Sequence, residues 1–165
     1  MPNIRTPQTD AYFAAFRAAH GIADTAYDVA RFGWTEEVSD QLLDLVLDGR
    51  KRATCCLMQQ IETGKEGMAR VGGYCVVLDG RDRPAAIWRT TDVSVRAVNQ
   101  VDDAFAWDEG EGDRTRADWL RMHNDYYSAL SQREGFAYDD GMPAVFERFT
   151  IVWPPEHADT GHARR

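Results

Sequence analysis

A change of hydrophobic period at Gly49 is the feature that most constrains the fold of this chain. Before Gly49, the apolar residues Val38, Leu42, Leu45 and Val46 recur at i, i+4, i+7 and i+8, which is the pattern of an amphipathic helix. After Gly49, short apolar segments that contain β-branched residues alternate with glycine-containing loops, which is typical of strands. The chain is therefore expected to combine helices with a sheet.

The segments 53–58, 74–78, 85–95 and 145–152 are predicted as strands of one curled sheet. The second and third are joined by Asp79-Gly80-Arg81-Asp82, a hairpin turn signal. Helices are predicted over 36–47 and 115–131, packed outside the sheet, and from Thr9 or Asp10 to about His20. Together these segments predict an α+β domain built on a small barrel or curled mixed sheet with flanking helices.

Length and composition are those of one ordinary globular domain. The chain has 165 residues, of which 44% are hydrophobic and 28% charged, and it shows no apolar run of the roughly 20 residues that a membrane span needs. No signal peptide is visible, and the three cysteines have no metal-ligand spacing, so a cytoplasmic protein with reduced cysteines is expected. The formal net charge of −8 disfavours sequence-blind binding to nucleic acid but leaves room for a local basic pocket.

Two segments could carry chemistry. Residues 49–54 read Gly-Arg-Lys-Arg-Ala-Thr, three cations between a helix end and a strand; they either complement the helix macrodipole or bind an anion. Residues 108–114 contain four acids and two glycines; they form either a solvated turn or a loop that brings a carboxylate to face the cations. No nucleotide-binding fingerprint or metal motif is present, so no cofactor and no metal are expected.

The ordered set of motifs from residue 28 to 153 resembles the ASCH domain family. That family's mark is a Gly-x-Lys-x-x-Thr/Glu motif at the end of a helix, matched here by Gly49, Lys51 and Thr54. Residues 1–27 are then an added N-terminal helix with its connection, and 154–165 an expected disordered tail. Further matches are Phe32-Gly33, Val71-Gly72, Arg89-Thr90-Thr91, Phe105-Ala106-Trp107, the spacing of Trp119 and His123, and Phe146, Glu147 and Phe149.

The resemblance implies a PUA-like β-barrel, a fold linked to RNA, with a cleft beside the lysine motif. Some ASCH members look like ribonucleases, and small members hydrolyse the acetyl amide of N4-acetylcytidine with a Lys, a Thr three residues on and a Glu. Carried over, these are Lys51, Thr54 and Glu111, with Glu109 as the alternative glutamate. The implied function is a hydrolase acting on RNA or a modified pyrimidine nucleoside.

The amidohydrolase hypothesis makes two physical demands. Thr54 needs a base, and Lys51 can be that base if burial and the adjacent Arg50 and Arg52 lower its pKa. Residues three apart on a regular strand point to opposite faces, so Lys51 and Thr54 share a site only if this stretch is a turn or a bulge.

Two other functions use the same cleft. In a ribonuclease, Lys51, Arg52 and Arg89 would hold a phosphate while Trp107 or a tyrosine stacks a base. In a non-catalytic module, the cleft would only bind RNA or a nucleotide. The oligomeric state stays open. The expected substrate-binding residues are Arg50, Arg52, Arg89, Trp107, Glu109, Arg114, His123, Tyr127 and Ser128.

Overall fold

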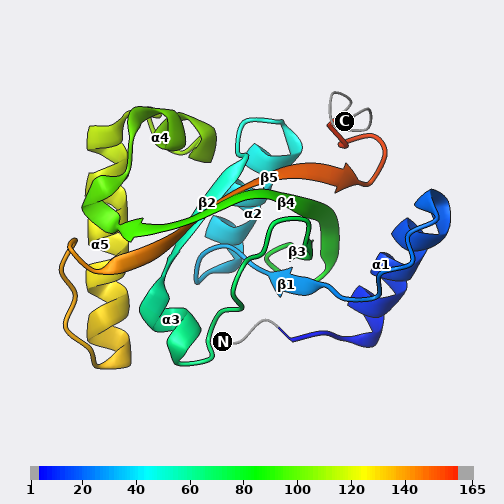
Figure 1. Ribbon diagram of the computed structural model, residues 1–165, viewed down its shortest axis with the longest axis horizontal. Helices are drawn as coiled ribbons and strands as arrows, with labels where there is room; N and C mark the ends of the chain where they lie inside the picture. Colours follow the sequence, from blue (N-terminus) through cyan, green and yellow to red (C-terminus); the bar gives the residue numbers. More distant parts are fainter. Residues whose placement is uncertain (1–3, 160–165) are drawn as a thin grey trace.

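The computed structural model describes residues 4–159, and Figure 1 shows their arrangement. Six helical segments and five strands follow one another along this part of the chain. In order they are α1 (Pro7–His20), β1 (Asp28–Ala30), α2 (Glu36–Leu47), β2 (Ala53–Leu57), α3 (Met58–Glu62), β3 (Tyr74–Leu78), β4 (Pro84–Ala97), the 3-10 turn η1 (Val98–Gln100), α4 (Asp103–Glu109), α5 (Arg116–Glu134) and β5 (Pro143–Trp153).

The strands form one mixed sheet in the order β1-β3-β4-β5-β2. β1 runs parallel to β3, and the other neighbours are antiparallel. The pairing of the long strands β4 and β5 shifts register at Ile87/Trp88 and at Thr90/Asp92, and such irregularities increase the local bend and twist of a sheet. The sheet therefore curls into a half-barrel, which is the PUA-like α+β fold that the sequence predicts.

Helices cover both faces of the curled sheet. Phe13 and Phe16 of α1 pack on the outer face of β1 and β3, while Leu43 and Val46 of α2 pack on the inner face. α4 and α5 cover the outer face of β2 and β5, with Trp119 among the buried residues of that cluster. Figure 1 shows α1 and α5 at opposite ends of the molecule, separated by the length of the sheet. This arrangement leaves the middle of the inner face for a site.

The helix termini follow from local chemistry. The side chain of Thr35 accepts from the backbone of Val38 and caps α2, and Thr115 caps α5 through the backbone of Asp118. α1 begins earlier than predicted, because Thr6 caps it and Pro7 occupies its first turn, a position that suits proline.

Four elements escaped the sequence prediction: β1, α3, η1 and α4. β1 has three residues and α3 has five, too few for either hydrophobic period to show. α4 extends to Glu109, so Asp108 and Glu109 belong to a helix rather than to the turn or loop predicted over 108–114.

The expectation of disorder from Pro154 onward is wrong for residues 154–159. The Asp159 carboxylate accepts from the Arg52 guanidinium at 2.8 Å with both oxygens, and from the Thr150 hydroxyl and the Ile151 amide at 2.9 Å. Residues 160–165 lie outside the described part of the chain. Among residues 4–159, no helix combines the length and the apolar character that crossing a bilayer demands.

Candidate active site

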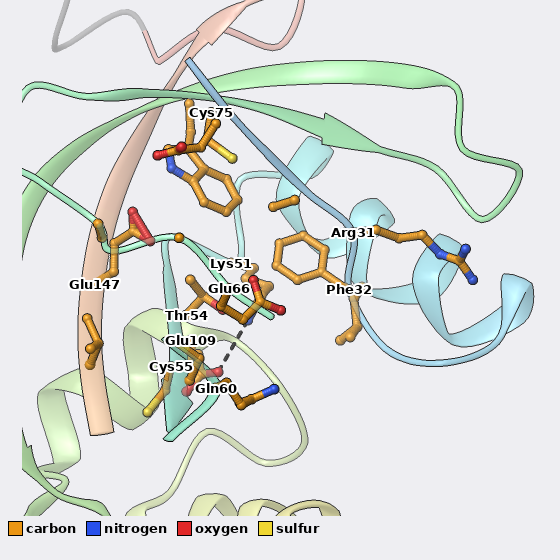
Figure 2. Close-up of a pocket in the computed structure, with 18 of the residues that line it drawn as sticks. Arg31, Phe32, Lys51, Thr54, Cys55, Gln60, Glu66, Cys75, Glu109 and Glu147 are labelled. Carbon is orange, nitrogen blue, oxygen red and sulfur yellow. Dashed lines mark hydrogen bonds and ion pairs between the residues drawn. The ribbon is translucent and has the colours of Figure 1, made fainter. Parts of the chain in front are cut away.

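A cavity of about 340 Å³ opens on the inner face of the half-barrel (Figure 2). Both edge strands line it, β1 through Asp28 and Ala30 and β2 through Thr54 and Cys56. The loop after β1 and the helix α5 contribute further wall residues, among them Phe32. This volume is in the range of pockets that enclose a small ligand.

Lys51 enters the cavity from an irregular segment between α2 and β2. Gly49 has a positive φ of 82°, a conformation that glycine adopts without strain. The backbone amides of Arg50 and Lys51 then both donate to the carbonyl of Leu45 at 2.9 Å. β2 begins only at Ala53, so Lys51 and Thr54 both line the cavity. The predicted irregular start of this segment is confirmed.

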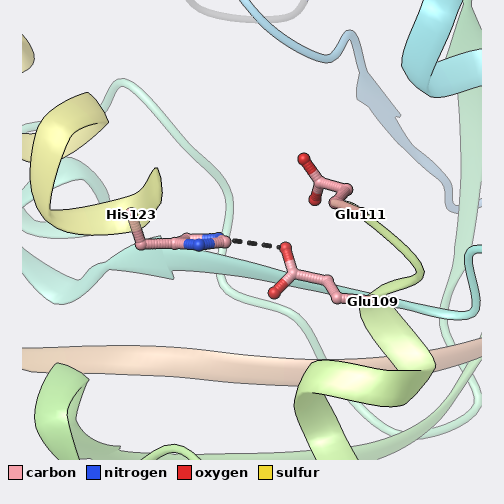
Figure 3. A group of neighbouring side chains, drawn as sticks. All are labelled: Glu109, Glu111 and His123. Atoms are coloured by element: carbon pink, nitrogen blue, oxygen red, sulfur yellow. Dashed lines mark hydrogen bonds and ion pairs between the residues drawn. The ribbon is translucent and has the colours of Figure 1, made fainter. Parts of the chain in front are cut away.

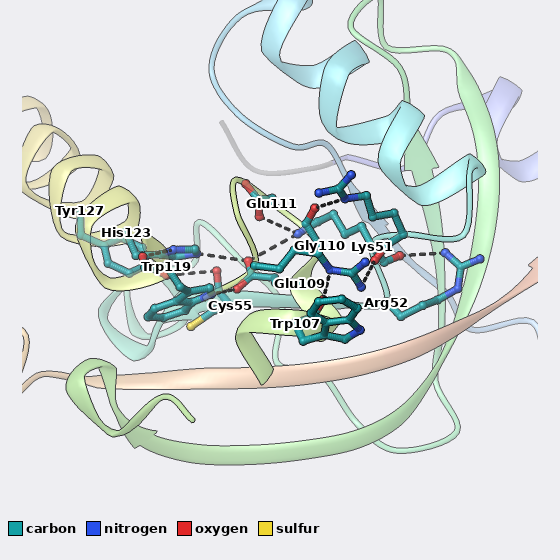
Figure 4. A network of polar contacts seen from close by, with 12 residues as sticks. Lys51, Arg52, Cys55, Trp107, Glu109, Gly110, Glu111, Trp119, His123 and Tyr127 are labelled. Atoms are coloured by element: carbon teal, nitrogen blue, oxygen red, sulfur yellow. Dashed lines mark hydrogen bonds and ion pairs between the residues drawn. The ribbon is translucent and has the colours of Figure 1, made fainter. Parts of the chain in front are cut away.

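Two carboxylates hold the buried ammonium of Lys51, which is 1% exposed. Its Nζ donates to Oε2 of Glu111 at 2.9 Å and to Oε1 of Glu109 at 3.4 Å (Figure 4). A buried charge is stable only when it is paired. The charge of the lysine therefore depends on both glutamates. The sequence left open which of the two is the functional one.

Arg50 fixes the loop after α4, which begins next to Glu109 and carries Glu111. Its guanidinium donates to the carbonyls of Gly110 at 2.9 Å and Gly112 at 3.3 Å. A Cβ on Gly110 would lie 2.4 Å from the Arg50 carbonyl oxygen, so the close approach of the two segments requires glycine there.

Glu109 also binds α5. One of its oxygens accepts from the indole N–H of Trp119, and the other lies 3.1 Å from Nε2 of His123. Nδ1 of His123 lies 2.9 Å from the backbone carbonyl of Trp119. A carbonyl and an ionised carboxylate are both acceptors, so both ring nitrogens carry protons and His123 is an imidazolium. Its ring stacks on the Trp119 ring at 3.7 Å, which favours a cation.

The pKa values follow from this network. Burial raises the pKa of Glu109, but the cations of His123 and Lys51 outweigh it and hold that pKa low. Burial lowers the pKa of Lys51, but Glu111 and Glu109 outweigh it and raise the pKa above its ordinary value. The condition for Lys51 to act as a base, a pKa lowered by burial and by Arg50 and Arg52, is therefore not met. The pKa of Glu111 is raised, chiefly by burial.

Glu109, Glu111 and His123 place one oxygen or nitrogen atom each within 4.8 Å of one another, as metal ligands do (Figure 3). Their chemistry does not fit a metal, because Nε2 of His123 carries a proton and the Lys51 ammonium already contacts both carboxylates. Two carboxylates, one ammonium and one imidazolium sum to zero charge. A divalent ion would have to displace protons from the cluster.

The family model for the ASCH domain matches residues 28–153. The chain belongs to the ASCH domain family. ASCH domains are PUA-like and are associated with RNA binding. No curated protein matches the chain.

Two solved structures share the ASCH fold with this chain. The ASCH domain from Lactobacillus crispatus JV V101 is 28% identical with a TM-score of 0.80, covering 90% of this chain and 96% of that one. Protein EF3133 from Enterococcus faecalis V583 is 28% identical with a TM-score of 0.79, covering 94% of this chain and 91% of that one.

The cavity wall contains six of the twelve residues that the sequence singled out. These six are Lys51, Thr54, Glu109, Glu111, His123 and Tyr127. Tyr127 donates its hydroxyl to the backbone carbonyl of Cys55 at 3.1 Å, so it ties α5 to β2 as well as facing the cavity.

The other six expected residues lie outside the cavity wall. Arg50 braces the loop after α4, and Arg52 pairs with Asp159, as described above. Arg89 is exposed, with its guanidinium 5.8 Å from the Tyr74 ring, and Ser128 is exposed on α5. The guanidinium of Arg114 stacks 3.8 Å from the ring of Trp107, which is 58% exposed. Arg50 and Arg52 therefore support segments next to the cavity, and none of the six residues lines its wall.

Sequence reasoning did not place four further wall residues in the site, Asp28, Glu66, Trp88 and Glu147. The available signal was Glu147, an acid beside the apolar residues Val145, Phe146 and Phe149 of β5, since an acid in a buried strand is uncommon. Burial raises the pKa of Glu66 and of Glu147 to about 7.

Proposed function

We propose that this ASCH protein hydrolyses an amide on a modified pyrimidine nucleoside of the N4-acetylcytidine type. The observation that carries the proposal is an acid-rich, nucleoside-sized cavity around the buried Lys51–Glu111 ion pair. Thr54 lines the same cavity and supplies a hydroxyl to it.

The charge of the wall favours an uncharged substrate over a phosphodiester. Five carboxyl groups line the cavity, those of Asp28, Glu66, Glu109, Glu111 and Glu147. They face three Lys or Arg side chains, of which Lys51 is neutralised by its two glutamates and Arg31 pairs with Asp82 at 3.0 Å. Because Glu109, Glu111, Lys51 and His123 sum to zero charge, a phosphate group would meet the carboxyls of Asp28, Glu66 and Glu147 with Arg70 as the one remaining cation of the wall within residues 4–159. An uncharged nucleoside would meet no such repulsion, so the ribonuclease hypothesis is disfavoured.

The protonation of the ion pair suggests the roles of its members. The raised pKa of Lys51 keeps it an ammonium in the resting protein, suited to stabilise a developing oxyanion. The raised pKa of Glu111 brings that carboxylate closer to the range of an effective general base. We therefore assign proton acceptance to Glu111 rather than to Lys51.

The proposed reaction has two stages. Oγ1 of Thr54 bonds to the amide carbonyl carbon while Glu111 takes the hydroxyl proton, and the oxyanion forms beside Lys51. The carbon–nitrogen bond then breaks, and the proton held by Glu111 passes to the leaving amine, which gives cytidine and an acetyl ester on Thr54. Water hydrolyses the ester and releases acetate, which restores the hydroxyl.

The test incubates the protein with N4-acetylcytidine and, separately, with single-stranded RNA, and identifies the products by mass spectrometry. We expect cytidine and acetate from the nucleoside, a loss of roughly 100-fold or more in Thr54→Ala, and substantial retention in Thr54→Ser. The matched control is Thr91→Ala, an exposed threonine of β4, which should keep wild-type turnover. Cleavage of the RNA with no release of acetate, or full activity in Thr54→Ala, would overturn the proposal.

A further inference from the structure

A row of polar side chains crosses the inner face of the sheet along the wall of the cavity. Glu147 of β5 is the register partner of Thr54 on β2. On its other side, the hydroxyl of Thr90 on β4 donates to Oε2 of Glu147 at 2.7 Å. Glu147 is 9% exposed and projects from β5 into the cavity (Figure 2). Thr90 thus fixes one carboxyl oxygen and leaves Oε1 for another donor.

Trp88 supplies a buried donor beside this carboxyl. It lines the cavity and is 3% exposed, and its Nε1 has no hydrogen-bond partner within residues 4–159. The indole is held by Phe149, stacked at 4.2 Å and 10°, and by Phe32 at 6.0 Å. Its N–H lies close enough to help lower the pKa of Glu147, but outside hydrogen-bond geometry. A buried polar group without a partner is uncommon and calls for an explanation.

We propose that Glu147 and Trp88 together recognise the edge of a planar nitrogen heterocycle that carries an exocyclic N–H donor beside a ring-nitrogen acceptor. The carboxylate accepts from the exocyclic nitrogen, and the indole N–H donates to the ring nitrogen. The pair is complementary to an aminopyrimidine edge and mismatched to a ring that lacks either group. The assignment rests on the proposed function for its substrate class, but its test needs no turnover.

The position of this edge agrees with the proposed chemistry. Directly opposed residues on antiparallel strands have their Cβ atoms roughly 5 Å apart, so a ring held by Glu147 has its exocyclic nitrogen next to Thr54. An acylated exocyclic nitrogen still carries one N–H, so the contact with Glu147 persists in the substrate. The exocyclic nitrogen would thus be both the group that Glu147 recognises and the group from which the acyl substituent is removed.

The experiment measures equilibrium binding of two free bases by ligand-observed NMR. Cytosine carries the ring nitrogen, and 3-deazacytosine has a C–H in its place. We expect the wild type to prefer cytosine by about tenfold. Trp88→Phe, which removes the N–H and keeps an aromatic ring, should bring the two bases to within about threefold. Glu147→Gln should weaken cytosine binding by about tenfold or more.

The matched control is Glu62→Gln, the same change on an exposed glutamate of α3, which should bind as the wild type does. Equal wild-type affinities for the two bases, wild-type affinity in Glu147→Gln, or no binding of either base would each overturn the assignment. The two-base comparison needs no variant, so misfolding cannot obscure it. If cytosine binds through Glu147 but no acetate is released from the nucleoside, the hydrolase proposal fails and the edge recognition stands.

Discussion

Nζ of Lys51 lies 2.9 Å from Oε2 of Glu111, a residue 60 positions further along the chain. This contact joins the irregular segment after α2 to the loop after α4, and it does so inside the protein. Removal of one partner leaves the other charge buried and uncompensated, which costs far more than the loss of a surface pair.

Lys51→Met should therefore destabilise the protein by about 3–5 kcal/mol, because two carboxylates lose their ammonium. The double variant Lys51→Met/Glu111→Gln should recover part of that loss, because it removes one of the stranded charges. Urea denaturation at pH 7 measures both.

The control is Lys65→Met, which breaks the pair between Lys65 and Glu134 at 3.0 Å. Lys65 is 39% exposed and its partner Glu134 14%, so this change leaves one partly buried charge and should cost clearly less than Lys51→Met, about 1 kcal/mol. A Lys51→Met protein as stable as Lys65→Met would contradict the dependence of the fold on the buried pair.

The cluster of Glu109, Glu111 and His123 is neutral when Lys51 is counted with it. We therefore expect metal ions to leave the thermal stability of the protein unchanged. EDTA, Mn²⁺ and Zn²⁺ should each move the wild-type Tm by less than about 1 °C, because no ion binds the native state in preference. Lys51→Ala removes the ammonium, so the same ions should raise the Tm of that variant. Differential scanning calorimetry distinguishes the two cases, and a clear rise in the wild type would show that a metal does enter.

Gly110 should be far less tolerant of a side chain than Gly135, although both have a positive φ, 73° and 78°. An added Cβ at Gly135 meets nothing within 4 Å, whereas at Gly110 it meets the Arg50 carbonyl. Gly135→Ala should cost about 1 kcal/mol, the strain of the left-handed backbone alone. Gly110→Ala should cost at least about 2–3 kcal/mol and lower turnover by displacing Glu109 and Glu111. Equal costs in thermal denaturation would argue against the close approach.

Sequence reasoning reached the fold through local signals. The period of Val38 to Val46 predicted α2 with its observed bounds, and the Asp79–Asp82 turn predicted the β3–β4 hairpin. The resemblance of residues 49–54 to the ASCH lysine motif pointed to Lys51 and Thr54. Each of these features is encoded within about a dozen neighbouring residues.

The parts that escaped prediction depend on contacts between distant segments. Arg52 pairs with a residue 107 positions away, which turned a predicted substrate ligand into an anchor for the C-terminal segment. Trp88 and Glu147 reach the cavity through a strand register with two shifts, and register is not readable from one strand alone. The raised pKa of Lys51 likewise reflects two glutamates from another element, not its cationic neighbours in sequence.

The buried carboxyl of Glu147 predicts a pH dependence of stability. Burial, together with the nearby charge of Asp28, raises its pKa to about 7, against the lowering by the hydrogen bond from Thr90 and by the nearby indole N–H of Trp88. Between the ordinary carboxyl pKa of 4.5 and about 7, the folded protein holds a proton that the unfolded chain has released. The contribution of this group to stability is therefore full below pH 4.5 and is lost as the pH rises through this window.

Glu147→Gln does not titrate, so its stability relative to the wild type should rise by on the order of 1–3 kcal/mol from pH 4.5 to 7.5. Urea denaturation at one-unit intervals measures this difference, with Glu62→Gln as the exposed control that should follow the wild-type curve. Curves for Glu147→Gln and the wild type that run parallel across this range would show that Glu147 stays ionised in the folded protein.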